Sequence, residues 1–420
     1  MKLNLKIGLL LLWLSVCMFG FITRPNEKPT SMVWGFYAHK MLNKLAVFTL
    51  PEQLIEFYKD QIEYITEHAV DPDKRRYAIR GEAIRHYIDL DHWGKDAIKQ
   101  LPRNLNEAIV NQAQYYIVND QDTLLVFDTL QIKENQKDTF YYTEQFKQHF
   151  TVFTNGIAKK SMLKWVEKYA MSTYDEVEWI VSTDFFADFI SNPTRSNYNL
   201  LIIDKYSPHG ILPYALPQVY RRLVNAFKEK NISKIIKLSA DIGHYIGDAH
   251  VPLHTTKNYN GQLTNQDGIH AFWESRIPEL FAETEFDFIV GQATYIDNIS
   301  DYVWRIIEKS HSHVDSVLAI EKRISQTVPK DQQYCYEQRL GAVTKLPCYD
   351  YAKLYNVQLD NQVEERFRSC ILAIGSIWMS AWTDAGQPLL NIPDQKNWNP
   401  GELNDSLSTN NNIHNIRIHE

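Results

Sequence analysis

Apolar residues recur at helical spacing along most of the chain, which predicts a mainly helical protein. Thr49-x-x-Glu52 has the form of a helix capping box, and apolar residues three and four positions apart follow it. The same spacing predicts further helices over residues 217–229, 232–250, 299–325 and 358–385. Gly386 and Pro388 come directly after the last of these and form a normal helix stop.

The chain shows no alternation of strands and helices and no glycine-rich nucleotide loop. We therefore expect an all-α fold. One stretch is ambiguous: residues 123–133, "TLLVFDTLQIK", are apolar enough for either a strand or a buried helix.

The two ends of the chain differ from the middle. Lys2 and Lys6 precede an apolar run over residues 7–21, which reads as a signal peptide or an N-terminal anchor. The run is shorter than the ~20 residues of a typical membrane span. A polar spacer completes residues 1–33, and residues 391–420 form an Asn-rich polar tail that we expect to be disordered. "LSVC" resembles a lipoprotein box, so a lipid anchor on Cys17 is an alternative, although Val16 occupies a position that prefers a small residue.

Composition is that of a soluble globular protein: 44% of residues are hydrophobic, and the net charge is −7. No basic surface indicates nucleic-acid binding, although bound metal ions could supply positive charge. Export implies an oxidising compartment, in which Cys335 and Cys348 could pair across a loop. Cys370 lies in an apolar helical pattern and is expected to be buried and unreactive.

The densest chemistry lies between residues 244 and 274. His244 and Asp248 are four residues apart on the predicted helix, so both side chains leave the same face. Pro252 ends that helix, and the turn after it brings back His254. His270 and Glu274 repeat the four-residue spacing after a glycine-containing loop. Imidazoles and carboxylates in this pattern are donors that suit zinc.

Two shorter pieces lie upstream. "WGFYAHK" places Trp34 five residues before His39, and Asp71 comes fifteen residues before His86. Taken alone, each piece is typical of ordinary packing or of a turn.

Together these motifs resemble the superfamily that joins bacterial zinc-dependent phospholipase C to the fungal single-strand-specific zinc nucleases. The resemblance spans residues 34–274 and implies a helical domain over residues 34–390, with an enlarged middle insertion within 95–230 and a C-terminal helical extension. The Trp–His and Asp–His spacings are similar to the nuclease branch, and the closing glutamate is similar to the phospholipase branch. The matching positions are Trp34, His39, Asp71, His86, His244, Asp248, His254, His270 and Glu274.

The resemblance implies up to three zinc ions per chain. Asp71, His86, His244 and Asp248 would hold the first ion; Asp248, His39 and the backbone of Trp34 the second; and His254, His270 and Glu274 the third. A hydroxide shared by two ions would attack the phosphodiester, and Asp71 would orient it or accept its proton. In the family the tryptophan is the mature N-terminus, whereas Val33 precedes Trp34 here and is a poor residue at a signal-peptidase cleavage point.

Other residues near the motifs have several interpretations. Tyr87 and His209 are candidate substrate contacts, with core packing or a structural role as the alternatives. His250 faces a different side of its helix from His244 and is expected to make a supporting hydrogen bond.

Two classes of function follow. The first is an exported zinc phosphodiesterase whose substrate is a phospholipid or a single-stranded nucleic acid, with the glutamate ligand favouring phospholipid. Such an enzyme could contact a membrane surface, and no protein partner is predicted. The second is a non-catalytic exported protein that zinc only stabilises.

Overall fold

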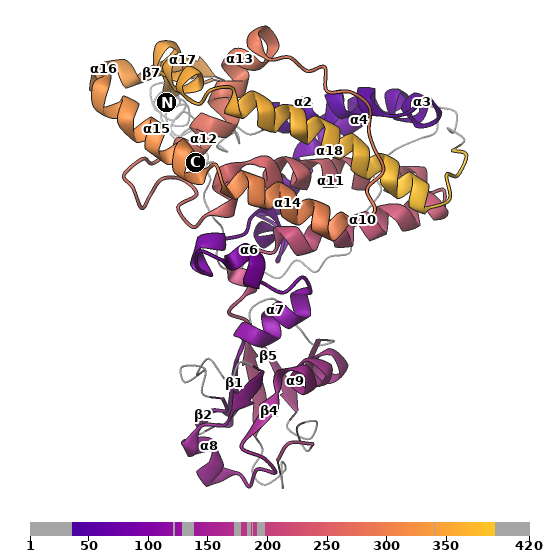
Figure 1. Ribbon diagram of the computed structural model, residues 1–420, viewed down its shortest axis with the longest axis vertical. Coiled ribbons are helices and arrows are strands. Elements are labelled where there is room, and N and C mark those ends of the chain that lie inside the picture. The colour runs from indigo at the N-terminus through magenta and orange to yellow at the C-terminus, as the bar shows by residue number, and fades with distance from the viewer. Residues whose placement is uncertain are drawn as a thin grey trace, which may run out of the picture. The chain divides into compact units, whose positions relative to one another are not determined.

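A computed structural model describes residues 36–390, apart from 121, 128–137, 172–177, 183–185, 187, 191–197 and 340. The described residues form many helices together with three small antiparallel sheets (Figure 1). The all-α prediction is therefore wrong, and the fold is a helix-rich mixture of α and β structure. The predicted signal peptide and spacer, including Cys17, and the polar tail lie outside the described residues.

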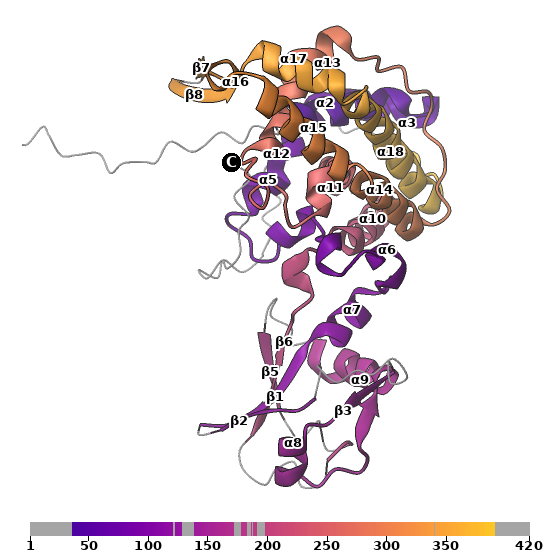
Figure 2. The ribbon, with the colours of Figure 1, turned by 60° about the vertical axis from the view of Figure 1, so that its left-hand side comes forward.

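Helix α11 (Ile232–His250) is the centre of the helical part. It packs against α2 (Phe36–Ala46), α10 (Leu212–Lys228), α14 (Ile299–His311) and α18 (Gln362–Asp384) (Figures 1 and 2). Every residue from Leu238 to His250 is buried, so this helix is enclosed on all sides. Any polar side chain on this stretch must therefore find its partner inside the protein.

Two glycines let α2 approach α11 closely. A β-carbon on Gly243 would lie 1.9 Å from the Asn43 Oδ1, and one on Gly247 would lie 2.7 Å from the His39 Nδ1. Asn43 is fully buried, and its side-chain amide donates to the Ala240 carbonyl at 3.1 Å. This close approach of the two helices places His39 next to the end of α11.

Replacing Gly243 with alanine is expected to lower the free energy of unfolding by about 1–3 kcal/mol, because the new methyl group overlaps the Asn43 amide. Alanine is more favourable than glycine inside a helix by roughly 1 kcal/mol, so the net loss is expected only because the energy of the clash is larger than this gain. Urea denaturation measures the change. The double variant Asn43→Ala/Gly243→Ala should lose less than the sum of the two single variants, and a Gly243→Ala protein as stable as the parent would contradict the close packing.

The predicted helices are present with shifted ends. Residues 49–65 form α3 (Glu52–Asp60) and α4 (Ile62–Glu67). The capping-box prediction is wrong, because Pro51 is the N-cap of α3 and the Thr49 hydroxyl donates to the Ala46 carbonyl instead. Helix α10 begins before the predicted residue 217 and contains Pro217, whereas α11 has the predicted bounds and an Asn231 cap.

The predicted helix over residues 299–325 is interrupted, because these residues form α14 and α15 (Val314–Thr327). Helical periodicity continues across this break, and for this reason the sequence pattern did not reveal it. The predicted helix over residues 358–385 is present as α18, which begins at Gln362. A separate helix, α17 (Tyr349–Gln358), precedes it, and Asp360 and Asn361 between the two helices both have positive φ.

The remaining short elements connect these helices. They are η1 (Val47–Thr49), η2 (His68–Val70), α5 (Asp71–Arg75), η3 (Ala83–His86), η4 (Leu90–His92), α6 (Ala97–Gln100), α7 (Leu105–Gln112), α8 (Glu144–His149), α9 (Lys159–Trp165), η6 (Val166–Ala170), η9 (Ser207–His209), η10 (Pro252–Thr255), α12 (Ile269–Ala271), η11 (Phe272–Arg276), α13 (Ile277–Glu285) and α16 (Lys330–Gln333).

The largest sheet lies in the segment that was expected to be an insertion into a helical domain. It contains β1 (Gln114–Val118), β2 (Thr123–Leu125), β5 (Glu178–Ser182) and β6 (Asn199–Ile203) in the order β2-β1-β6-β5. Tyr116 pairs with Leu125 on one side and with Leu201 on the other. Burial alternates along β1 and β6, as in a strand with one covered face. Within the ambiguous stretch 123–133, the described part therefore begins as a strand.

The other two sheets are hairpins. One pairs β3 (Thr139–Tyr141) with β4 (Gly156–Ala158), and the other pairs β7 (Tyr334–Arg339) with β8 (Ala342–Pro347). A disulfide joins Cys335 to Cys348 at the base of the β7–β8 hairpin, and Cys370 is a buried free thiol on α18. Among the described helices, none is long and apolar enough to cross a membrane.

Candidate metal centre

Eight buried histidine and acidic side chains gather around the end of α11. Helix α2 supplies one histidine, the short elements α5 and η3 supply one residue each, α11 supplies two, and the segments after it supply three. Each residue is at most 7% exposed. They are His39, Asp73, His86, His244, Asp248, His254, His270 and Glu274.

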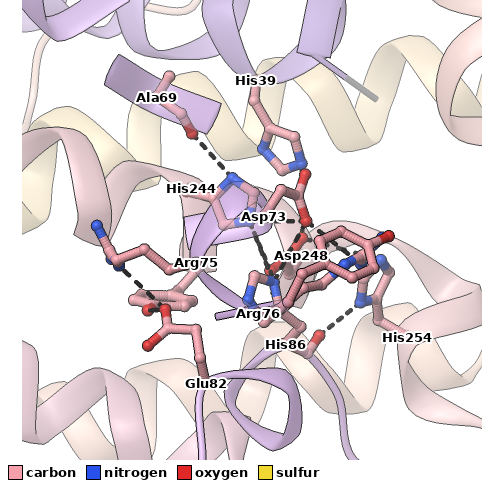
Figure 3. Close-up of polar contacts among 12 residues, drawn as sticks. His39, Ala69, Asp73, Arg75, Arg76, Glu82, His86, His244, Asp248 and His254 are labelled. Carbon is pink, nitrogen blue, oxygen red and sulfur yellow. Dashed lines mark hydrogen bonds and ion pairs between the residues drawn. The ribbon is translucent and has the colours of Figure 1, made fainter. Parts of the chain in front are cut away.

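Asp248 is the centre of this group (Figure 3). Its Oδ2 lies 2.9 Å from the His86 Nδ1 and 3.3 Å from the His244 Nε2. Its Oδ1 lies 3.5 Å from the His39 Nε2 and 3.8 Å from the His254 Nε2. One carboxylate therefore contacts histidines from four different elements.

A second carboxylate, Glu274, extends the cluster. Its Oε2 lies 2.6 Å from the His270 Nε2 and 3.4 Å from the His254 Nε2, and its Oε1 lies 3.2 Å from the His39 Nε2. His39 thus links the Glu274 and Asp248 parts of the cluster. Glu274 lies on η11, a single π-helical turn; such turns are rare and often occur at functional sites.

Backbone carbonyls orient three of the imidazoles. The Nδ1 of His244 lies 2.8 Å from the Ala69 carbonyl, and that of His270 lies 3.2 Å from the Tyr259 carbonyl. The His254 Nδ1 bonds the His86 carbonyl in the same way. A ring that donates from Nδ1 keeps its Nε2 unprotonated and available as a ligand, which is how metal-binding histidines are usually held.

The structure places Asp73, not Asp71, against the histidines. The Asp73 Oδ1 lies 3.7 Å from the His244 Nε2 and 3.8 Å from the His86 Nδ1. Asp71 turns outward instead, and its carboxylate bonds the His68 Nδ1 at 2.5 Å and the Lys74 Nζ at 2.9 Å. Residues two apart on a helix leave different faces, so only one of the two aspartates can reach the cluster. This corrects the assignment of Asp71 as ligand and proton acceptor.

Two arginines lie beside the cluster that the sequence pattern did not identify as site residues. Arg76 is 3% exposed; its Nη1 lies 3.3 Å from the Asp73 Oδ1, and its Nη2 donates to the Tyr77 hydroxyl. Arg75 binds Asp241 at 3.0 Å and Glu82 at 3.4 Å. The run of mixed charges in "DPDKRRYAIRGE" was the available signal, but such runs usually form solvated surfaces.

Burial dominates the electrostatics of the cluster. It lowers the pKa of His86 and His244 well below the ordinary value, and it lowers the pKa of His254 as well. These rings are therefore neutral near pH 7, which is the state that metal ligation requires. Burial, together with Asp73 and Glu274, raises the pKa of Asp248 well above its usual range, because close carboxylates in a buried site repel one another.

Glu274 behaves differently from Asp248. Burial alone would raise its pKa, but the contacts with His254, His270 and His39 outweigh burial and hold the pKa well below the ordinary value. A carboxylate that stays ionised among imidazoles is a suitable ligand for a cation.

The remaining predicted residues that the structure describes do not join the cluster. Trp34 lies outside the described residues. Tyr87 is buried, and its hydroxyl donates to the Pro208 carbonyl at 3.1 Å. His209 stacks on His92 with ring centroids 3.4 Å apart and lies 3.5 Å from the Asp89 Oδ2. His250 points away toward α18, with its Nδ1 2.7 Å from the Ile246 carbonyl. Its hydrogen bonds therefore go to its own helix and to Ser369 on α18, and not to the cluster.

Comparisons with protein-family models, with curated proteins and with solved structures found no match for this chain. The described side chains themselves define the class of site: buried histidine and acidic groups that are positioned to hold a metal ion. There are three such groups, namely His39–His244–Asp248, Asp73–His86–His244 and His254–His270–Glu274, and the ligand atoms of each lie within 4.8 Å of one another.

Proposed function

We propose that this chain is a zinc-dependent phosphodiesterase. The observation that carries the proposal is the continuous cluster in which Asp248 and Glu274 connect three potential metal-binding groups. A structural zinc site usually has four ligands around one ion and no neighbouring ion. Several adjacent sites that share residues are typical of enzymes that cleave phosphate esters.

The donor types support zinc. Five imidazoles and three carboxylates, with no cysteine, form the cluster. Zinc accepts this mixture, whereas calcium and magnesium prefer oxygen donors alone. Only the group His254–His270–Glu274 has the ligand set that the resemblance implied. The group Asp73–His86–His244 has Asp73 in the place assigned to Asp71 and does not include Asp248, and His244 joins His39 and Asp248 in the group to which the resemblance assigned the backbone of Trp34. Bound zinc would supply a Lewis acid and lower the pKa of water.

The protein side chains would have separate tasks. Asp248 would fix the spacing of the sites, because its two oxygens face different histidines. Asp73 would orient water or accept its proton, and the Arg76 guanidinium beside it would add positive charge for the phosphate. Three divalent ions outweigh the three carboxylates, so the loaded site would attract an anion although the whole chain carries −7.

We propose a phospholipid as the substrate and an extracytoplasmic location for the reaction. The net negative charge argues against a long groove for a polyanion such as single-stranded nucleic acid. Nucleic acid remains the alternative, because both substrates contain the same phosphodiester group. In the other class of function, a non-catalytic protein, the ions would only stabilise the fold.

Removing the metal is expected to abolish hydrolysis and to lower the melting temperature. The full chain, loaded with zinc, is tested on bis(p-nitrophenyl) phosphate, phosphatidylcholine vesicles and single-stranded DNA, before and after treatment with 1,10-phenanthroline. We expect chelator-sensitive turnover of the chromogenic ester that added zinc restores. Turnover of phosphatidylcholine but not DNA supports the phospholipid, and the reverse supports the nuclease alternative.

A zinc-loaded chain that cleaves none of the three substrates would contradict the proposed phosphodiesterase activity. If chelation then still lowers the melting temperature, the non-catalytic alternative is the better account of the cluster.

A further inference from the structure

Arg276 ends the π-helical turn that carries Glu274. The two residues are two positions apart on η11, and Arg276 is 3% exposed. Its Nε donates to the Pro347 carbonyl at 3.1 Å, its Nη1 lies 3.3 Å from the Glu337 Oε2, and its Nη2 bonds the other oxygen of the same carboxylate. A buried guanidinium with a two-point carboxylate contact holds its backbone in a defined position.

Both partners of Arg276 belong to the β7–β8 hairpin. Glu337 is two residues after Cys335, and Pro347 directly precedes Cys348. The disulfide therefore closes the hairpin at the end where Arg276 binds it. Figure 2 shows the hairpin beside α16 and α17.

The hairpin has little core of its own. Tyr336 is 73% exposed and Val343 is 67% exposed. A two-stranded hairpin is marginal on its own in water. The disulfide and the Arg276 contacts are therefore important for holding Glu337 and Pro347 in place.

We propose that Arg276 is a positioning residue for the metal group His254–His270–Glu274, and that the Cys335–Cys348 disulfide keeps its hairpin partner in register. Among the described contacts of the Arg276 side chain, none is with these three ligands. Arg276 acts by fixing the turn on which Glu274 lies. The inference rests on the metal-binding part of the proposed function and does not depend on which substrate is cleaved.

The position of Glu274 then depends on the redox state of a distant bond. A phosphine reductant transfers two electrons to the disulfide, water supplies the two protons, and the phosphine leaves as its oxide. The two free thiols no longer restrain the hairpin, so the Glu337 carboxylate and the Pro347 carbonyl lose their fixed position relative to Arg276.

The test measures zinc and not hydrolysis. Zinc content and the rate of zinc transfer to a chromogenic chelator are compared for the full chain and for Arg276→Met, Arg276→Lys and Glu337→Gln. Glu279→Gln is the matched control. Glu279 lies on α13 and forms a 2.9 Å ion pair with Arg339 of the same hairpin, so its substitution weakens another contact of the hairpin and leaves the contacts of Arg276 intact.

Arg276→Met is expected to retain about one zinc ion fewer than the parent, or to release one ion roughly 10–100 times faster, the usual effect of losing an outer support of a metal ligand. Arg276→Lys should recover part of the loss, and Glu279→Gln should match the parent. Tris(2-carboxyethyl)phosphine should accelerate release from the parent but not from Cys335→Ser/Cys348→Ser, which should already be fast.

Equal zinc content and release in Arg276→Met and Glu279→Gln would overturn the proposal. If Arg276→Met fails to fold, as judged by circular dichroism, Glu337→Gln decides, because it nearly keeps the shape of the carboxylate but removes the charge and one of the two oxygens that accept from Arg276. Hydrolysis by the parent is recorded separately. A parent that binds zinc but cleaves nothing would contradict the proposed function while leaving the effect of Arg276 on zinc measurable.

Discussion

Replacing Asp248 with alanine is expected to abolish zinc-dependent hydrolysis and to reduce the amount of bound zinc. Its two oxygens face His86 and His244 on one side and His39 and His254 on the other, so its loss disconnects more than one metal group. The loss of an outer partner already costs about 10–100-fold in metal affinity, and a shared ligand should cost more. Zinc content and kcat/KM for the chromogenic ester measure the result.

Asp241 provides the matched control for this variant. It lies two turns earlier on the same buried helix, but it binds Arg75 and not the histidine cluster. Asp241→Ala should therefore lower stability, because Arg75 loses a partner, while zinc content stays near that of the parent. An Asp248→Ala protein with full zinc and full activity would remove the central ligand assignment.

Asp73→Asn and Asp71→Asn are expected to differ strongly although the two residues are almost adjacent. Asp73 faces His86 and His244, so its loss should reduce zinc affinity and kcat/KM by more than about 100-fold. Asp71 bonds His68 and Lys74 at a partly exposed site, so its loss should change activity by only a few fold.

The same two assays, zinc content and kcat/KM, distinguish the two aspartates. Both substitutions preserve the size of the side chain, so differences in packing are small, and both replace the charged carboxylate by a neutral amide with one acceptor oxygen. The opposite result would be a fully active Asp73→Asn and an inactive Asp71→Asn. It would show that Asp71, fifteen residues before His86, is the ligand and that Asp73 is not.

Local spacing predicted the part of the cluster that lies on one stretch of chain. His244 and Asp248, and likewise His270 and Glu274, face the same way because a helix brings residues four apart onto one side. Pro252 ends α11 and the turn brings His254 back, as the sequence suggested, and the structure shows that the His254 ring reaches the His86 carbonyl. These relations depend on helix geometry and on chain stops, and both can be recognised without knowing the fold.

The prediction of fold class was wrong because the strands are short and their pairing is not local. The four-stranded sheet contains strands of three to five residues, and β1 pairs with β6 from more than eighty positions later. Runs this short can be read as helix or strand, and the pairing that decides between them is non-local. The long intact periodicity of α11 had no such ambiguity.

The amino-acid sequence by itself determined that this protein would contain a buried helix bearing His244 and Asp248, followed by a second histidine–acid pair, because both features follow from spacing along the chain. Tertiary structure alone decided that Asp73 and not Asp71 meets these residues, that Arg76 lies beside it, and that Arg276 connects the Glu274 turn to a disulfide-closed hairpin. These choices depend on which face of a short element packs inward, and that is set by distant segments that no local pattern encodes.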